Sequence, residues 1–120
     1  MDLFRSVLYL PASNARAIEK ARGLDCDAVI LDLEDAVAPD AKGEARQAAV
    51  DALKAGGFRP HVGVRINGLD TPWGDDDLTA LAGLKPAFVV APKIESAEAV
   101  REVATRLPDG VALWIMVQTQ

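Results

Sequence analysis

Hydrophobic residues in this chain concentrate in five short runs, separated by stretches in which apolar residues recur every three or four positions. Runs rich in Val, Ile and Leu and without strict alternation are typical of strands that are buried on both faces. The stretches between them have the spacing of amphipathic helices. We therefore expect strands at residues 5–10, 27–33, 62–66, 87–91 and 111–117, and helices at 13–22, 43–55, 75–84 and 96–106.

The order of these segments predicts the fold class. Strands that alternate with helices indicate a parallel α/β sheet with helical crossovers. Ser13 or Asn14 is expected to cap the first helix, and Ser96 the fourth. The turn after the first strand reads PASN and lacks the glycines of a phosphate-binding fingerprint, which argues against a dinucleotide-binding sheet. The other common solution is the TIM barrel, (β/α)8, in which sites lie at the carboxyl ends of the strands.

Composition narrows the class of function. The chain has 120 residues, of which 50% are hydrophobic and 26% charged, and 13 basic against 18 acidic residues give a net charge of −5. This balance argues against nucleic-acid binding, which requires a basic surface. No apolar run is long enough to span a bilayer, and the run VLYL is too short for the core of a signal peptide. Cys26 is the single cysteine, so we expect no internal disulfide and a cytoplasmic location.

Polar side chains follow four of the five apolar runs. In a parallel barrel all of these strand ends open on one face, so the side chains are expected to converge. Adjacent carboxylates repel each other unless a cation offsets them, and a hard cation such as Mg²⁺ would do so. Two acids, an arginine and a lysine together suggest a site for an anionic, metal-assisted substrate. The residues are Glu34 and Asp35, then Arg65 and Asn67, then Lys93, and finally Gln118.

Each charge at these strand ends also has a structural interpretation. Arg65 ends an apolar strand, where burial is costly unless its guanidinium binds an anion. Glu34 or Asp35 could instead pair with Arg65 in a structural salt bridge. Lys93 and Glu95 could likewise neutralise each other.

Three other features have simpler interpretations. The aspartates at 75–77 are expected to stabilise the positive end of a helix dipole rather than to bind a metal. His61 precedes a strand and is expected to lie in solvent. Trp73 has two open interpretations, a lid over the site or a packing contact with the following helix.

Four motifs, in this order, resemble the citrate lyase beta-subunit-like family, which includes citryl-CoA and malyl-CoA lyases. They are RSVLYLPASN at 5–14, AVILDLEDAV at 28–37 followed by Lys42 and Glu44-Ala45-Arg46, VRINGLDT at 64–71 with Asp77-Leu78, and APKIES at 91–96. The resemblance covers essentially the whole chain. It implies a TIM barrel, Mg²⁺, and reversible carbon–carbon cleavage of a 3-hydroxyacyl-CoA.

The resemblance also implies roles for individual residues. Arg65 would bind the substrate and stabilise the enolate, while Glu34 and Asp35 would lie around the substrate and the water shell of the metal. Asn67, Lys93 and Gln118 would contribute to substrate binding. Gln118 stands where the family has a glutamate metal ligand, and the second ligand, an aspartate after strand six, lies beyond residue 120.

Length adds one further expectation. A closed barrel takes about 250 residues, so residues 1–120 are expected to form the N-terminal part of a single barrel domain, with four βα units and the fifth strand. Two functions stay open, a lyase and a non-catalytic subunit that binds an acyl-CoA or a partner. We expect an acyl-CoA or small carboxylate as the substrate and a homo-oligomer as the assembly.

Overall fold

Strands and helices alternate along the chain, as the sequence predicts. The computed structural model describes residues 6–34, 37–69, 71–92, 97–108 and 110–115. A short 3₁₀ turn, Pro39–Ala41, precedes the second α-helix. The elements are β1 (Val7–Pro11), α1 (Ala15–Ala21), β2 (Ala28–Asp32), α2 (Lys42–Ala55), β3 (His61–Arg65), α3 (Gly74–Leu81), β4 (Phe88–Ala91), α4 (Ala97–Arg106) and β5 (Ala112–Ile115).

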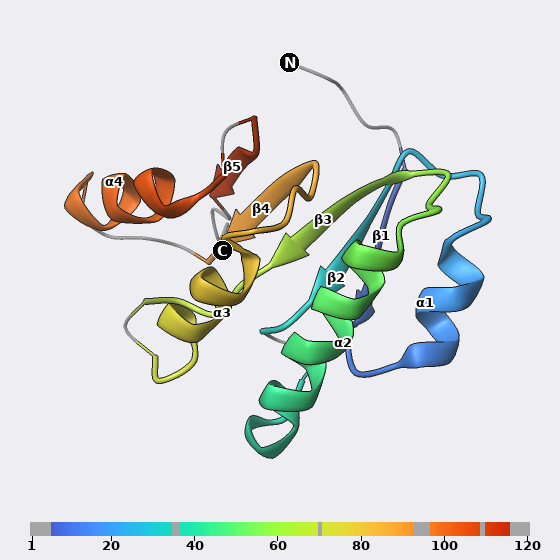
Figure 1. Ribbon diagram of the computed structural model, residues 1–120, viewed down its shortest axis with the longest axis horizontal. Coiled ribbons are helices and arrows are strands. Elements are labelled where there is room, and N and C mark those ends of the chain that lie inside the picture. Colours follow the sequence, from blue (N-terminus) through green and yellow to red (C-terminus); the bar gives the residue numbers. More distant parts are fainter. Residues whose placement is uncertain (1–5, 35–36, 70, 93–96, 109, 116–120) are drawn as a thin grey trace, which may run out of the picture.

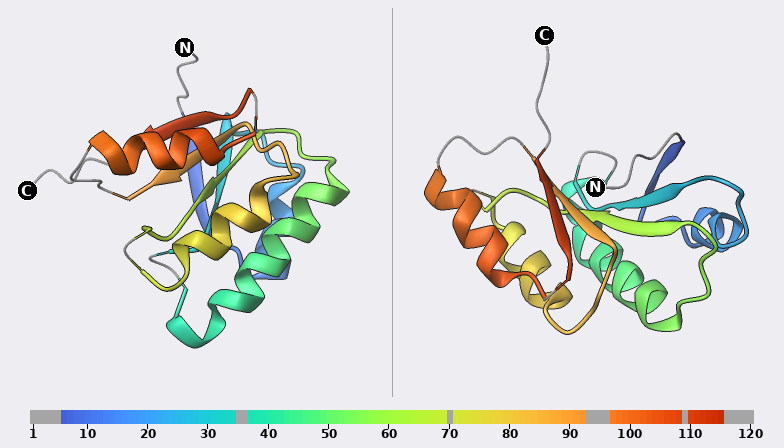
Figure 2. Two further views of the ribbon diagram at one scale, coloured as in Figure 1. Left: turned by 60° about the vertical axis from the view of Figure 1, so that its left-hand side comes forward. Right: turned by 90° about the horizontal axis from the view of Figure 1, so that it is seen from above.

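The strands form one parallel sheet whose order is the order of the chain, β1-β2-β3-β4-β5. The sheet is curved, and the helices lie along one side of it (Figures 1 and 2). This arrangement is that of consecutive βα units in a barrel, in which each helix returns the chain to the start of the next strand. The register places Asp32 beside Arg65, at the carboxyl ends of β2 and β3.

Both faces of the sheet are packed. On the helix side, alternate strand residues such as Val29, Val64 and Val89 join the main core with α1 to α4. On the other side lies a smaller cluster built around Phe88, whose ring stacks on Trp114 with centroids 4.0 Å apart. Gly63 makes room for this ring, because a Cβ at that position would lie 2.2 Å from the Phe88 side chain.

The predicted helix caps have different outcomes. Asn14 is the N-cap of α1, and its side chain accepts a hydrogen bond from the amide of Ala17 at 3.1 Å. Ser96 lies outside the described residues. No helix in the described ranges is long and apolar enough to cross a membrane.

The two outer strands, β1 and β5, are the edges of the sheet. Large apolar side chains of β1 face solvent there: Val7 is 39%, Leu8 42% and Tyr9 44% exposed. Unpaired strand edges with exposed apolar residues favour association with another chain segment. The sheet formed by the described strands is therefore open at both sides.

Candidate active site

A buried ion pair lies at the carboxyl ends of β2 and β3. Arg65 donates from Nε to Asp32 Oδ1 at 2.9 Å and from Nη2 to Asp32 Oδ2 at 2.5 Å. The Asp32 side chain is 1% exposed and that of Arg65 is 11% exposed. Two parallel N–H···O contacts fix the plane of the guanidinium as well as its position. The amide of Glu34 also donates to Asp32 Oδ1, at 2.8 Å.

Glu34 and Tyr9 complete the surroundings of this arginine. Glu34 Oε1 lies 3.9 Å from Arg65 Nε, and the Glu34 side chain is 36% exposed. The Tyr9 ring lies under the guanidinium, with 4.8 Å from its centroid to Cζ. The contact with Asp32 raises the pKa of Arg65 above its usual value, against the opposing effect of burial, and the negative charges of Asp32 and Glu34 act in the same direction.

Among the described residues, the main ionic partner of Arg65 is Asp32, and Glu34 is a second, more distant carboxylate. The salt bridge considered with Asp35 falls outside the described residues. The sequence contains the signal for the pairing of Asp32 with Arg65. Ile30 and Asp32 lie on one face of β2, and the register brings Asp32 opposite Arg65 at the same end of the sheet.

A second group of polar contacts supports the backbone that carries Glu34. Lys42, the first residue of α2, is 5% exposed. Its ammonium donates to the carbonyl of Leu33 at 3.1 Å and to that of Glu34 at 2.9 Å. The Trp73 ring covers the same ammonium, with 4.9 Å from Nζ to the ring centroid.

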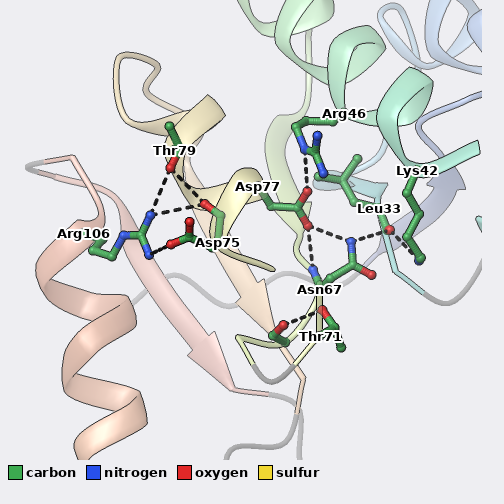
Figure 3. A network of polar contacts seen from close by, with 10 residues as sticks. Leu33, Lys42, Arg46, Asn67, Thr71, Asp75, Asp77, Thr79 and Arg106 are labelled. Atoms are coloured by element: carbon green, nitrogen blue, oxygen red, sulfur yellow. Dashed lines mark hydrogen bonds and ion pairs between the residues drawn. The ribbon is translucent and has the colours of Figure 1, made fainter. Parts of the chain in front are cut away.

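Asp77 connects this support to α3. Asp77 is 1% exposed and accepts from Arg46 Nε at 2.9 Å. It also accepts from the backbone amide of Asn67 at 2.9 Å and from Asn67 Nδ2 at 2.7 Å, and Nδ2 donates to Leu33 O at 2.9 Å as well. Figure 3 shows this chain of contacts running from Arg46 through Asp77 and Asn67 to Leu33 and Lys42.

The three aspartates of α3 therefore do not share one role. All lie in its first turn, where a helix dipole favours anions. Asp75 is exposed and pairs with Arg106 of α4 at 2.5 Å. Asp77 is buried in the network of Figure 3, which the helix-dipole interpretation did not anticipate.

The other predicted residues are distributed as follows. Asp35, Lys93 and Gln118 lie outside the described residues. Asn67 is 2% exposed, and its amide nitrogen is engaged by Leu33 and Asp77. His61 is exposed, as predicted, at the first residue of β3 and thus at the far end of that strand from Arg65.

Few candidate metal ligands lie among the described residues at these strand ends. Within the described ranges, no three or more His, Cys, Asp or Glu side chains form a group that could hold a metal. Asp32 forms a close ion pair with Arg65. Of the two carboxylates beside this arginine, Glu34 is the more exposed. Mg²⁺ is usually held by one or two carboxylates together with waters and substrate oxygens, and the described residues do not by themselves group such ligands into a metal site.

Comparison with known proteins identifies the relatives of this arrangement. Residues 5–109 match the family model described as HpcH/HpaI aldolase/citrate lyase, which confirms the predicted resemblance. A (3S)-malyl-CoA thioesterase of Cereibacter sphaeroides is 50% identical over 117 residues, 97% of this chain and 41% of the relative. An L-malyl-CoA/beta-methylmalyl-CoA lyase of the same species is 40% identical over 94 residues, 75% of this chain and 30% of the relative.

The fold is shared with solved structures. The citrate lyase beta subunit from M. tuberculosis, complexed with oxaloacetate and magnesium, is 40% identical with a TM-score of 0.70, over 90% of this chain and 46% of that one. This similarity confirms the predicted TIM-barrel fold class, of which the five strands are a part. The chain spans less than half the length of each of these relatives.

Proposed function

Because this chain belongs to the HpcH/HpaI aldolase/citrate lyase family, we propose that the full-length protein is a Mg²⁺-dependent lyase that cleaves a carbon–carbon bond of a 3-hydroxyacyl-CoA. Residues 1–120 would form the N-terminal part of its single barrel domain. The observation that carries the proposal is Arg65, an arginine at a strand end whose orientation and charge are fixed by buried Asp32 beside the carboxylate of Glu34.

The reaction requires an anion to be stabilised. Loss of the proton from the substrate hydroxyl lets the C2–C3 bond break, and the electron pair of that bond stays on the thioester fragment as an enolate. Protonation of the enolate then gives the shorter acyl-CoA. Negative charge develops on the thioester oxygen, where a preorganised cation acts more strongly than a mobile one. Arg65 is suited to this role, because Asp32 aligns its guanidinium and keeps its pKa raised.

Other residues have proposed places around this arginine. Glu34 and Asp35 would lie beside the substrate and the water shell of the metal, and Lys93 and Gln118 would contact the substrate from the neighbouring strand ends. Asn67 would support the site without reaching its surface, because its side chain is buried in the network of Figure 3.

Mg²⁺ is part of the proposal because the M. tuberculosis relative is complexed with magnesium. The ion would polarise an oxygen of the substrate. Its ligands would come from outside the described residues, and Gln118 is the candidate in this chain. An amide oxygen can coordinate Mg²⁺, although it lacks the charge of a carboxylate.

Thioester hydrolysis is the second candidate, favoured by one observation. The malyl-CoA thioesterase is 50% identical to this chain, against 40% for the malyl-CoA lyase. Hydrolysis also places negative charge on the thioester oxygen, this time in a tetrahedral intermediate, so the same arginine could serve both reactions.

Malyl-CoA is the substrate that tests both candidates. Carbon–carbon cleavage of malyl-CoA releases acetyl-CoA and glyoxylate, whereas hydrolysis releases malate and the free thiol of CoA. The full-length protein should be incubated with malyl-CoA with and without Mg²⁺, and all four products should be separated by chromatography. Mg²⁺-dependent acetyl-CoA and glyoxylate support the lyase. Malate with free CoA would favour the thioesterase, and no turnover would favour a non-catalytic acyl-CoA-binding or partner subunit.

Two further proposals concern the cellular location and the oligomeric state of the protein. A single cysteine is consistent with a reducing compartment, so we expect the protein in the cytoplasm. The remaining strands of a closed barrel would pair with the β1 and β5 edges, and we expect the full-length protein to assemble as a homo-oligomer.

A further inference from the structure

Lys42 is a buried cation whose partners are all close to the proposed active site. Its side chain is 5% exposed, and an ammonium is costly to bury without partners. Here the partners are two backbone carbonyls, of Leu33 and Glu34, and the face of the Trp73 ring. Charge-assisted hydrogen bonds and a cation–π contact both stabilise an ammonium in such a place.

The two carbonyls belong to consecutive residues directly after β2. The segment is held from its other side as well, because the Glu34 amide donates to Asp32 at 2.8 Å and the Leu33 amide donates to the carbonyl of Arg65 at 2.9 Å. Amide and carbonyl groups of the same two residues are therefore both restrained. The backbone position of Glu34 follows from these contacts.

The network of Figure 3 restrains the same segment from α3. Asn67 donates to the Leu33 carbonyl, and Asp77 holds Asn67 through both its backbone amide and its side chain. The start of α3 can approach so closely because of Gly74, at which a Cβ would lie 2.2 Å from the carbonyl oxygen of Gly68. Lys42 and Asn67 thus share one acceptor, Leu33 O, from two different elements.

From this geometry we infer that Lys42 is a positioning residue: it holds the backbone after β2 so that the Glu34 carboxylate faces Arg65 at the strand ends. The inference rests on the proposed function, because it assigns Lys42 to that site. The described contacts of the Lys42 ammonium are with the backbone carbonyls of Leu33 and Glu34, not with the Glu34 carboxylate or the Arg65 guanidinium, so Lys42 would act through the Leu33–Glu34 backbone. A residue of this kind affects the chemical step more than substrate affinity.

A matched control lies at the opposite end of the sheet. Arg22, which follows α1, donates to the carbonyl of Gly56 and lies over the Phe58 ring, with 4.5 Å from Cζ to the ring centroid. When replaced by methionine it loses the same kinds of contact as Lys42, namely a charge, a carbonyl partner and a cation–π partner, and in addition an ion pair with exposed Glu19 at 2.8 Å. Its side chain is 20% exposed, and none of its contacts involves the strand ends that carry Arg65.

The kinetic test uses Lys42→Met and Arg22→Met in the full-length protein with malyl-CoA. We expect Lys42→Met to lower kcat at least tenfold and to change KM less than threefold, while Arg22→Met leaves kcat within twofold. In a Glu34→Gln background the additional effect of Lys42→Met on kcat should fall below threefold, because both changes disable the same carboxylate. Equal effects of Lys42→Met with and without Glu34→Gln would assign Lys42 a general structural role and overturn the inference.

Hydrogen exchange tests the same inference without activity. Lys42→Met should accelerate exchange of the backbone amides of Leu33 and Glu34 at least tenfold, relative to the amides of β4 in the same protein, and Arg22→Met should not. Unchanged exchange at these two amides would overturn the inference even in an active enzyme. An inactive parent protein would instead refute the proposed function, while the exchange measurement would still decide whether Lys42 holds this segment.

Discussion

Replacement of Asp32 by asparagine removes the charge that orients Arg65 while keeping the size of the side chain. Asp32 is 1% exposed and makes two contacts with Arg65, at 2.9 and 2.5 Å. Breaking a buried ion pair by removing one partner costs about 3–5 kcal/mol. The asparagine oxygen can still accept from the Glu34 amide, and Glu34 Oε1 remains 3.9 Å from Arg65. We therefore expect a smaller loss for Asp32→Asn, about 2 kcal/mol of unfolding free energy.

The assay is urea unfolding of the full-length protein, followed by circular dichroism at pH 7. In a thermal melt of the same protein, a loss of about 2 kcal/mol corresponds to a decrease of about 4–8 °C in Tm for a domain of 150–250 residues. Asp75→Asn is the matched control, because Asp75 also contacts an arginine at 2.5 Å but is 73% exposed. An exposed pair of this kind contributes about 0–1 kcal/mol.

Activity provides the second readout of Asp32→Asn. With its orienting carboxylate gone, Arg65 should stabilise the developing anion less well, and kcat/KM should fall about tenfold or more, which corresponds to ~1.4 kcal/mol. A loss of stability below about 0.5 kcal/mol together with unchanged kcat/KM would refute the reasoning. Asp32 would then be a buried acid without influence on Arg65.

Four further predictions follow from the strand ends and edges. Arg65→Ala should abolish turnover in a correctly folded full-length protein, and steady-state activity within about threefold of the parent, under ~1 kcal/mol, would reduce Arg65 to a structural ion pair. The pKa of Arg65 is raised in the folded protein, so the stability contributed by its charge is fully present below the usual pKa of arginine and is lost only above the folded pKa. The loss of unfolding free energy caused by Arg65→Met, measured in urea, should therefore be equal at pH 7 and pH 9. Gln118→Glu should strengthen Mg²⁺ binding in calorimetric titration, because a carboxylate replaces an amide, and equal affinities would mean that residue 118 does not touch the metal. The 120-residue chain by itself should associate through the β1 and β5 edges in size exclusion with light scattering, and a monodisperse monomer that melts cooperatively would contradict the open-sheet interpretation.

The order and approximate bounds of the strands and helices could be predicted well from the sequence. Apolar runs and helical spacing placed each strand and helix within a few residues, because burial on both faces leaves a strong pattern in a parallel sheet. The convergence of Arg65 and Glu34 at one end also followed from that order. Both predictions depend only on periodicity and on the parallel arrangement.

Pairing between side chains was harder to predict. Asp32 was overlooked as the partner of Arg65, because the choice among three nearby acids depends on strand register and on which face each residue occupies. The buried positions of Lys42 and Asp77 also escaped prediction, since a charged residue at a helix start usually lies in solvent. Contacts of this kind require the packing of α2 and α3 against the strand ends.

The sequential order of the sheet has a consequence for folding. Each strand pairs with the one that precedes it in the chain, so we expect β3 to pair with β2 before β5 joins the sheet. A slip of β3 by one residue would turn Arg65 to the helix side and leave the Asp32 charge buried alone, which makes misregistration costly. Pulse-labelled exchange during refolding should find the amides of β2 and β3 protected before those of β5, and simultaneous protection would contradict this order. The Asp32–Arg65 ion pair therefore favours one register of β2 and β3, in addition to fixing the orientation of the guanidinium.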